Sequence, residues 1–237
     1  MCRMHECRGC MDAQERPFGY FSLVCTKKSI TPIKGGTNAK MKPRSQIYQI
    51  TKTMKINLAS TSPRRKQLLE QIGIDFELVN IAIDETWDAH EPAKVHVKRM
   101  ALEKGLAAKS KIQNNLPILA ADTCVVLDSV ILGKAETKED AIQMLEELSG
   151  RTHHVYTAVA LITETEQICL NINHVSFRPL SKNDIQAYCN TEEPLGKAGA
   201  YAIQGKAAAF IERLEGSYSG VMGLPLYEVA EMLNNIK

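Results

Sequence analysis

The 237-residue sequence contains no run of about 18 consecutive apolar residues, the length that a membrane-spanning helix needs. Its longest mostly apolar segments, such as Val155–Ile162, have the length of one strand. Aromatic residues make up only 5% of the chain, and the formal net charge is only +2. These scarcities argue against a membrane protein, a nucleic-acid-binding protein and a strongly acidic protein. We therefore expect neither membrane nor nucleic acid among the partners.

The near-neutral net charge of the whole chain conceals two parts of opposite charge. Residues 1–53 contain 10 basic and 3 acidic residues, whereas residues 54–237 contain 19 basic and 24 acidic residues. Four of the seven cysteines also lie before residue 54. An odd number of cysteines without a signal peptide favours a reducing compartment, so we expect a cytoplasmic protein.

The basic tail, residues 1–53, has no sustained helix or strand periodicity. Its pattern is interrupted by Pro17, Pro32, Gly35, Gly36 and Pro43. We expect a disordered N-terminal extension, with one folded domain over residues 54–237.

Three other interpretations of the tail are open. A zinc site at Cys2, His5, Cys7 and Cys10 would lack a second ligand pair of the usual spacing. A transit peptide would be richer in serine and would show an amphipathic stripe. A nucleic-acid-binding arm would bind DNA in a strongly salt-dependent way.

From Ile56 onward, strand and helix patterns alternate. Strands are predicted at residues 56–59, 76–83, 117–128, 153–163, 167–177 and 206–214, and helices at 63–72, 92–109, 137–148, 181–189 and 226–236. The nearly continuous apolar run at 117–128 is typical of a strand buried on both faces, which places it at the centre of the sheet. The order of elements predicts a mixed α/β fold.

The segment Ser60–Arg65 connects the first strand to the first helix and contains hydroxyl groups, Arg64 and Arg65. The start of a helix has unpaired N–H groups and a partial positive charge, and with two arginines it suits a polyphosphate. A capped surface helix with solvated arginines is the alternative.

Asp122 and Thr123 lie within the apolar run. Because a buried carboxylate is rarely left alone, Asp122 is expected to pair with a lysine or arginine, bind a metal or lie at a cleft. Glu85, Lys104 and Lys134 could supply further acids and bases, although each taken alone is typical of a surface.

Glycines are frequent in residues 193–205, 216–220 and 223–225. They permit close backbone approach to a ligand, and Tyr201 or Gln204 could contact a base or sugar. No Walker A or Rossmann fingerprint is present. Plain turns are the alternative interpretation.

Taken in this order, the segments resemble the Maf family of nucleoside triphosphate pyrophosphatases over about residues 56–233. The likeness rests on Leu58–Arg65, Ala121–Thr123, Gly133-Lys134, Leu148–Gly150, Thr157, Lys197–Gly205 and Gly223–Pro225. The resemblance is to the branch that hydrolyses dTTP and UTP, marked by Arg65, Thr123 and Gln204. Ala135 departs from the family, which usually has proline there, and we expect a looser turn after Lys134. The implied fold is a mixed twisted sheet flanked by helices, with a central substrate cleft.

The resemblance implies hydrolysis of dTTP and UTP to the monophosphate and pyrophosphate by water attack at the α-phosphorus, assisted by Mg²⁺ or Mn²⁺. It makes Asp122 the catalytic carboxylate and lets Arg65, Thr123 and Gln204 select the nucleotide. Glu85 is the best second carboxylate, so Asp122 and Glu85 are the expected metal ligands. The expected substrate-binding residues are Ser60, Arg64, Arg65, Lys104, Thr123, Lys134 and Gln204.

Two other functions stay open at this point. The enzyme could act on modified or non-standard nucleotides, or the domain could bind a nucleotide without turnover as a regulator of septum formation. Members of the family are often dimers, so a homodimer is also open.

We predict that a chain beginning at Met54 folds and retains its nucleotide-hydrolysing activity, because ordered patterning starts there. Circular dichroism and pyrophosphate release, compared between the two lengths, check this. Loss of folding or of activity in the shorter chain would assign the tail a necessary role.

Overall fold

The structure, a computed structural model, describes residues 54–88 and 90–236. The expectations for the tail concern residues 1–53 and lie outside the described residues. The elements are β1 (Lys55–Ala59), α1 (Pro63–Gln71), β2 (Asp75–Leu78), α2 (Ala93–Lys109), β3 (Ile118–Leu127), β4 (Val130–Leu132), α3 (Lys138–Leu148), β5 (Thr152–Ile162), β6 (Glu166–Phe177), α4 (Lys182–Cys189), the 3₁₀ helix η2 (Lys206–Phe210), β7 (Ile211–Glu215), α5 (Tyr218–Met222) and α6 (Leu226–Asn234).

The strands form one seven-stranded mixed sheet in the order β2-β1-β3-β5-β6-β7, with β4 paired to β3. Strand β1 runs parallel to β2 and β3, whereas the β3–β5, β5–β6 and β6–β7 pairs are antiparallel. The prediction of a mixed α/β fold with residues 117–128 near the centre is confirmed.

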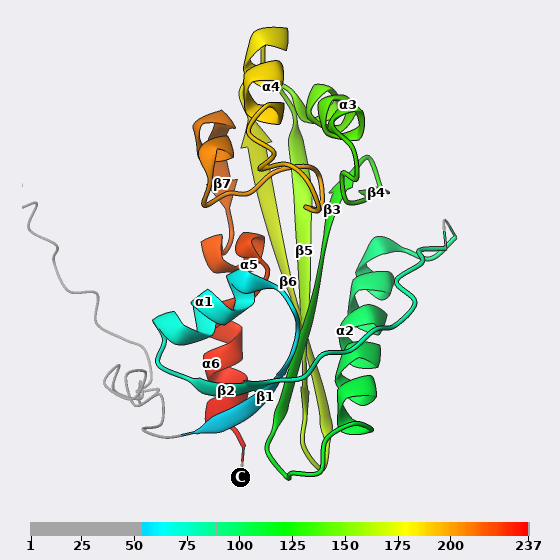
Figure 1. Cartoon of the computed structure of the whole chain (residues 1–237), viewed down its shortest axis with the longest axis vertical. Helices are drawn as coiled ribbons and strands as arrows, with labels where there is room; N and C mark the ends of the chain where they lie inside the picture. Colours follow the sequence, from blue (N-terminus) through cyan, green and yellow to red (C-terminus); the bar gives the residue numbers. More distant parts are fainter. Residues whose placement is uncertain (1–53, 89, 237) are drawn as a thin grey trace, which may run out of the picture. The chain divides into compact units, whose positions relative to one another are not determined.

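Helices cover both faces of this sheet (Figure 1). On β3, Leu119 and Val125 belong to a core shared with α1, α3, α4, α5 and α6, whereas Ala120 and Cys124 belong to a core shared with α2. This alternation follows from the two-residue period of a strand. Both faces are apolar, which explains why the β3 sequence is apolar without interruption except at Asp122 and Thr123.

The edge of β3 is open at one place. The pairing with β1 ends at Ala59 and Ala120, and the pairing with β4 begins only at Val125. Between them, residues 121–124 have no neighbouring strand on that edge among the described residues. We call this opening the notch, and it contains Asp122 and Thr123. Side chains from both faces of the sheet can therefore reach one shared space.

Two predicted strands are wrong in extent. Strand β2 ends at Leu78 instead of residue 83, because the parallel pairing with β1 stops there and β1 itself ends at Ala59. In the segment that follows, the Asp84 carboxylate accepts hydrogen bonds from the N–H and hydroxyl groups of Thr86, which favours a turn.

The segment predicted as a strand at 206–214 is a 3₁₀ helix over its first half, and β7 covers only Ile211–Glu215. Ala207 and Phe210 are both buried, and a spacing of three residues brings them to one side in a 3₁₀ turn, whereas in a strand they would point to opposite faces. The N–H of Lys206 also donates to the Glu193 carboxylate, which fixes the start of this turn. The short elements β4 and α5 were not predicted.

A capping box begins α3: the Thr137 hydroxyl accepts from the Asp140 N–H, and the Asp140 carboxylate accepts from the Thr137 N–H. At α1, Ser62 occupies the N-cap position, but its side chain makes no capping bond. Instead the Ser60 hydroxyl accepts from the Ser62 N–H at 3.2 Å. Within the described residues, no helix is both long and apolar enough to cross a membrane.

We predict that Gly199→Ala destabilises the fold more than Gly73→Ala. Both glycines have a left-handed φ, of +64° and +71°, which costs a non-glycine residue about 1 kcal/mol or more. A Cβ at Gly199 would also lie 2.9–3.0 Å from the Val125 side chain, whereas at Gly73 it would meet no described atom within 4 Å. Overpacking should add roughly 1–3 kcal/mol at Gly199 only. Urea unfolding of both variants measures the difference in the free energy of unfolding. An equal loss of this free energy in the two variants would contradict the predicted overpacking at Gly199.

Candidate active site

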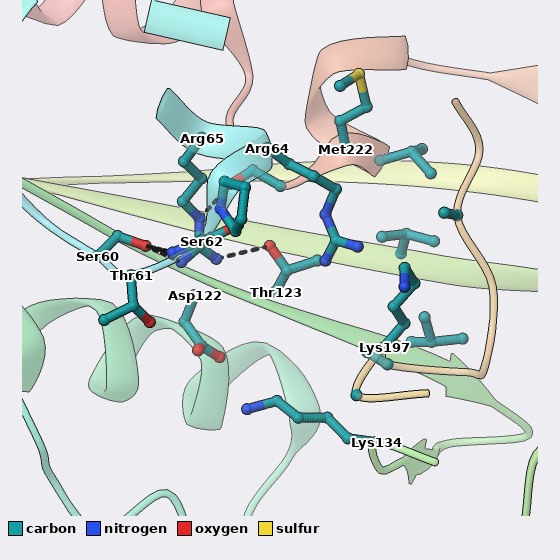
Figure 2. A pocket seen from close by; sticks show the side chains of 18 of the residues that line it. Ser60, Thr61, Ser62, Arg64, Arg65, Asp122, Thr123, Lys134, Lys197 and Met222 are labelled. Carbon is teal, nitrogen blue, oxygen red and sulfur yellow. Dashed lines mark hydrogen bonds between the residues drawn. The ribbon is translucent and has the colours of Figure 1, made fainter. Parts of the chain in front are cut away.

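A cleft of about 550 Å³ lies at the notch (Figure 2). All of the residues predicted for the site line it: Ser60, Arg64, Arg65, Glu85, Lys104, Asp122, Thr123, Lys134 and Gln204. They come from the β1–α1 connection, the first turn of α1, the segment before α2, helix α2, strand β3, the segment after β4 and the glycine-rich stretch. Residues far apart in the sequence thus converge on the notch.

Arg65 is held by three neutral acceptors. Its Nε donates to the Gly223 carbonyl at 2.8 Å, its Nη1 to the Ser60 hydroxyl at 3.1 Å and its Nη2 to the Thr123 hydroxyl at 3.3 Å (Figure 2). Burial lowers the pKa of Arg65, while the nearby Asp122 carboxylate raises it. An arginine nevertheless remains charged in a protein. The guanidinium is therefore a fixed cation with its plane set by three separate segments of the chain.

Thr123 is positioned from the other side by strand β5. Its hydroxyl lies 2.9 Å from the hydroxyl of Thr157, its partner in the β3–β5 register. The fully buried Thr157 hydroxyl donates in turn to the Gly220 carbonyl at 2.8 Å. Thr123 and the buried Thr157 thereby connect the Arg65 guanidinium to α5, and each hydroxyl can satisfy a donor and an acceptor at once.

On the opposite face of β3, charges of alternating sign form a chain. Lys104 Nζ donates to Asp122 Oδ1 at 2.6 Å and lies 2.7 Å from Glu85 Oε1, and Lys134 Nζ donates to Glu85 Oε2 at 2.9 Å. Asp122 and Lys104 side chains are only 14% and 11% exposed, so their mutual pairing offsets the cost of burying both charges. Burial raises the pKa of Glu85, but the hydrogen bonds from Lys104 and Lys134 outweigh it and lower this pKa to about 2.

A second pair of cations lies on the other wall of the cleft. Arg64 Nε is buried and has no hydrogen-bond partner among residues 54–88 and 90–236. Lys197 Nζ donates to the carbonyls of Glu193 and Leu195, which carry no net charge. Burial lowers the pKa of both side chains, and for Lys197 the nearby Arg64 charge lowers it further.

Backbone hydrogen bonds fix where Lys197 lies. The Gly196 and Gly199 N–H groups donate to the carbonyls of Ala135 and Gly133, at 2.8 Å and 3.0 Å, and the Ala135 N–H donates to the Lys197 carbonyl at 3.4 Å. A proline at 135 could not make this last bond. The expectation of a looser turn there is wrong, because the alanine is fully buried and hydrogen-bonded.

The glycine-rich stretch divides into an inner and an outer part. Tyr201 is buried and its hydroxyl lies 2.9 Å from His153 Nε2, so its ring packs beneath the glycine-rich wall of the cleft. Gln204 is exposed and lines the cleft, with its amide available to a ligand. Of the two residues considered for base contact, Gln204 is the better placed.

Asp122 and Glu85 are the residues that could hold a metal ion. No group of three or more histidine, cysteine, aspartate or glutamate side chains gathers into a metal site within the described part of the chain. Two carboxylates on either side of one ammonium nevertheless fit Mg²⁺, which is commonly bound by one or two carboxylates together with substrate phosphates and water. Oxygen ligands of this kind also suit Mn²⁺.

Sequence reasoning missed three contributors to the site: Lys197, Thr157 as a hydrogen-bonding residue, and the carbonyl of Gly223. Lys197 was visible as the only charge between Pro194 and Gly205 in the glycine-rich stretch. The other two carry no sequence signal of their own, because their contacts depend on strand register and on a backbone atom.

Comparison with known proteins agrees with this geometry. The family model described as "Maf-like protein" matches residues 55–236. The dTTP/UTP pyrophosphatase of Alkalilimnicola ehrlichii is 48% identical over 187 residues, covering 77% of this chain and 93% of that protein. The dTTP/UTP pyrophosphatase of Escherichia coli (strain K12) is 46% identical over 179 residues, covering 75% of this chain and 91% of that protein.

Among solved structures, a HAM1 protein from Coxiella burnetii matches with a TM-score of 0.45 and 21% identity, covering 78% of this chain and all of that chain. The family match over residues 55–236 and the curated relatives together settle the classification: this chain belongs to the Maf family.

Proposed function

We propose that this protein is a nucleoside triphosphate pyrophosphatase that hydrolyses dTTP and UTP to dTMP and UMP, with release of pyrophosphate. The observation that carries the proposal is the pairing of the largely buried Asp122 with Lys104 in a cleft that also contains the Arg65–Thr123 contact. Curated relatives with 46–48% identity are named for this activity. All of the predicted site residues lie within residues 54–236, so we assign the catalytic function to this part of the chain.

Asp122 is suited to the attacking water. Its carboxylate lies at the notch, and Lys104 holds one of its oxygens, Oδ1, so the group cannot rotate freely. The water oxygen forms a bond to the α-phosphorus while the bond between this phosphorus and the α,β-bridging oxygen breaks. The water proton passes to Asp122, and pyrophosphate leaves with the bonding electron pair. Positioning and neutralisation of charge supply most of the catalysis in such a transfer.

A divalent cation, Mg²⁺ or Mn²⁺, would be held by Asp122 and Glu85. When bound, it supplies positive charge to the phosphate oxygens. Glu85 is ready for this role because its pKa of about 2 keeps it ionised at all ordinary pH values. Lys104 and Lys134 keep the two carboxylates close together and partly neutralise their negative charge.

Nucleotide selection is assigned to Arg65, Thr123 and Gln204. The first two form a rigid pair, since Arg65 donates to Thr123 and to Ser60. Gln204 is exposed in the cleft, and its amide can both donate to and accept from a pyrimidine edge. A uracil or thymine ring presents alternating acceptors and an N–H donor, which this combination can match.

We predict that Asp122→Asn lowers the rate of pyrophosphate release from dTTP and UTP by at least about 100-fold, the usual contribution of a general base. The amide keeps the shape of the side chain but cannot take the proton. Circular dichroism and thermal unfolding confirm that the variant is folded. Asp128→Asn, at an exposed turn outside the cleft, is the matched control and should be active. Near wild-type turnover of Asp122→Asn would remove Asp122 from this role.

We predict that Thr123→Val and Gln204→Ala change the ranking of nucleotides more than the rate of the best one. Each removes polar contacts to the base or to Arg65, and one such contact corresponds to about tenfold in relative kcat/KM. A panel of UTP, dTTP, CTP, ATP and GTP measures the ranking, with Gln186→Ala on the outer surface of α4 as the control. An unchanged ranking in both cleft variants would contradict the assignment.

A further inference from the structure

The two walls of the cleft differ in how their positive charges are compensated. On the wall that holds Asp122 and Glu85, both Lys104 and Lys134 are paired with these carboxylates. On the opposite wall, neither Arg64 nor Lys197 forms an ion pair with any described carboxylate. One wall is therefore close to neutral, and the other carries uncompensated positive charge.

The backbone places Lys134 and Lys197 on different walls of the cleft. Lys134 forms an isolated antiparallel bridge with Ala198, the residue next to Lys197. Lys197 itself lies in a bend just before this bridge, and the side chains of Lys134 and Lys197 diverge. Figure 2 shows this: the Lys134 side chain extends toward Asp122, and the Lys197 side chain points to the side where Arg64 lies.

The two cations without ion pairs differ in how their side chains are satisfied. The Lys197 ammonium is fixed by the carbonyls of Glu193 and Leu195, while the Glu193 carboxylate itself accepts from the Tyr188 hydroxyl and the Lys206 N–H. Arg64 Nε is a buried donor without a partner in the described part of the chain. A buried unsatisfied donor is costly unless a ligand completes it.

We propose that Lys197 and Arg64 form a subsite for the β- and γ-phosphates, the two phosphates that leave as pyrophosphate. This inference rests on the proposed function, because the α-phosphorus must then lie beside Asp122. The terminal phosphates carry most of the charge of a nucleoside triphosphate, and on the neutral wall both lysines are already paired with carboxylates. Lys197 is thus a further substrate-binding residue, and the subsite stabilises the negative charge that develops on the leaving group.

Binding of inorganic pyrophosphate with Mg²⁺ to the full chain, measured by titration calorimetry, tests the subsite without turnover. Lys197→Gln should weaken this binding about tenfold or more, the loss of one charge-assisted hydrogen bond. Lys197→Arg should retain most of it, because the charge is kept. Lys206→Gln is the matched control, since Lys206 is an exposed lysine of the next segment that does not line the cleft, and it should bind as the wild type does.

Steady-state kinetics give the second readout. Lys197→Gln should raise the KM for dTTP and UTP by similar factors and leave their ratio within about twofold, because the subsite contacts no base. Pyrophosphate binding within twofold of the wild type would overturn the proposal, as would a changed nucleotide ranking with unchanged pyrophosphate binding. If Lys197→Gln does not fold, Arg64→Gln is measured in the same way, and wild-type binding there also overturns it.

The two proposals fail separately. A wild-type protein that binds pyrophosphate through Lys197 but releases none from any triphosphate contradicts the proposed function alone. A wild-type protein that hydrolyses dTTP, with pyrophosphate binding unaffected by Lys197→Gln, contradicts the subsite alone.

Discussion

Neighbouring residues of an extended strand must point to opposite faces of the sheet, and this constraint organises the whole site. Asp122 faces α2 and meets Lys104, whereas Thr123 faces α1 and meets Arg65. In an ordinary sheet these two side chains would be separated by the next strand. Here β1 stops at Ala59 and β4 starts pairing only at Val125, so both side chains border the same cleft. One strand thereby presents an acid from one face and a selecting hydroxyl group from the other.

The electrostatics follow from this division. The α2 face contains two carboxylates and two lysines in close contact, an arrangement that suits proton transfer and a divalent cation. The α1 face contains cations bonded to neutral hydroxyl and carbonyl groups, an arrangement that suits an incoming polyanion. The cost of desolvation is offset on the first face because charges are paired, and on the second because Arg65 and Lys197 retain neutral hydrogen-bond acceptors.

Much of this could be predicted from local sequence. The apolar run around Asp122, the Pro63 helix start and the Thr137–Asp140 capping box each depend on neighbours within a few residues, and the structure contains them. The predicted site residues also converge on one cleft. What sequence could not give are contacts across long separations, such as Arg65 to the Gly223 carbonyl. The 3₁₀ turn at Lys206 was hidden for the same reason, since Glu193 lies thirteen residues away.

The hydrogen bonds between Gly133–Ala135 and Gly196–Gly199 join the segments that carry Lys134 and Lys197. Because these bonds run from backbone to backbone, they do not depend on which side chains line the cleft. The separation between the two lysine-bearing segments is thus a property of the main chain, to which the Ala135 N–H contributes. Substitutions of the two lysine side chains can accordingly change the charge of the cleft without separating the segments that carry them.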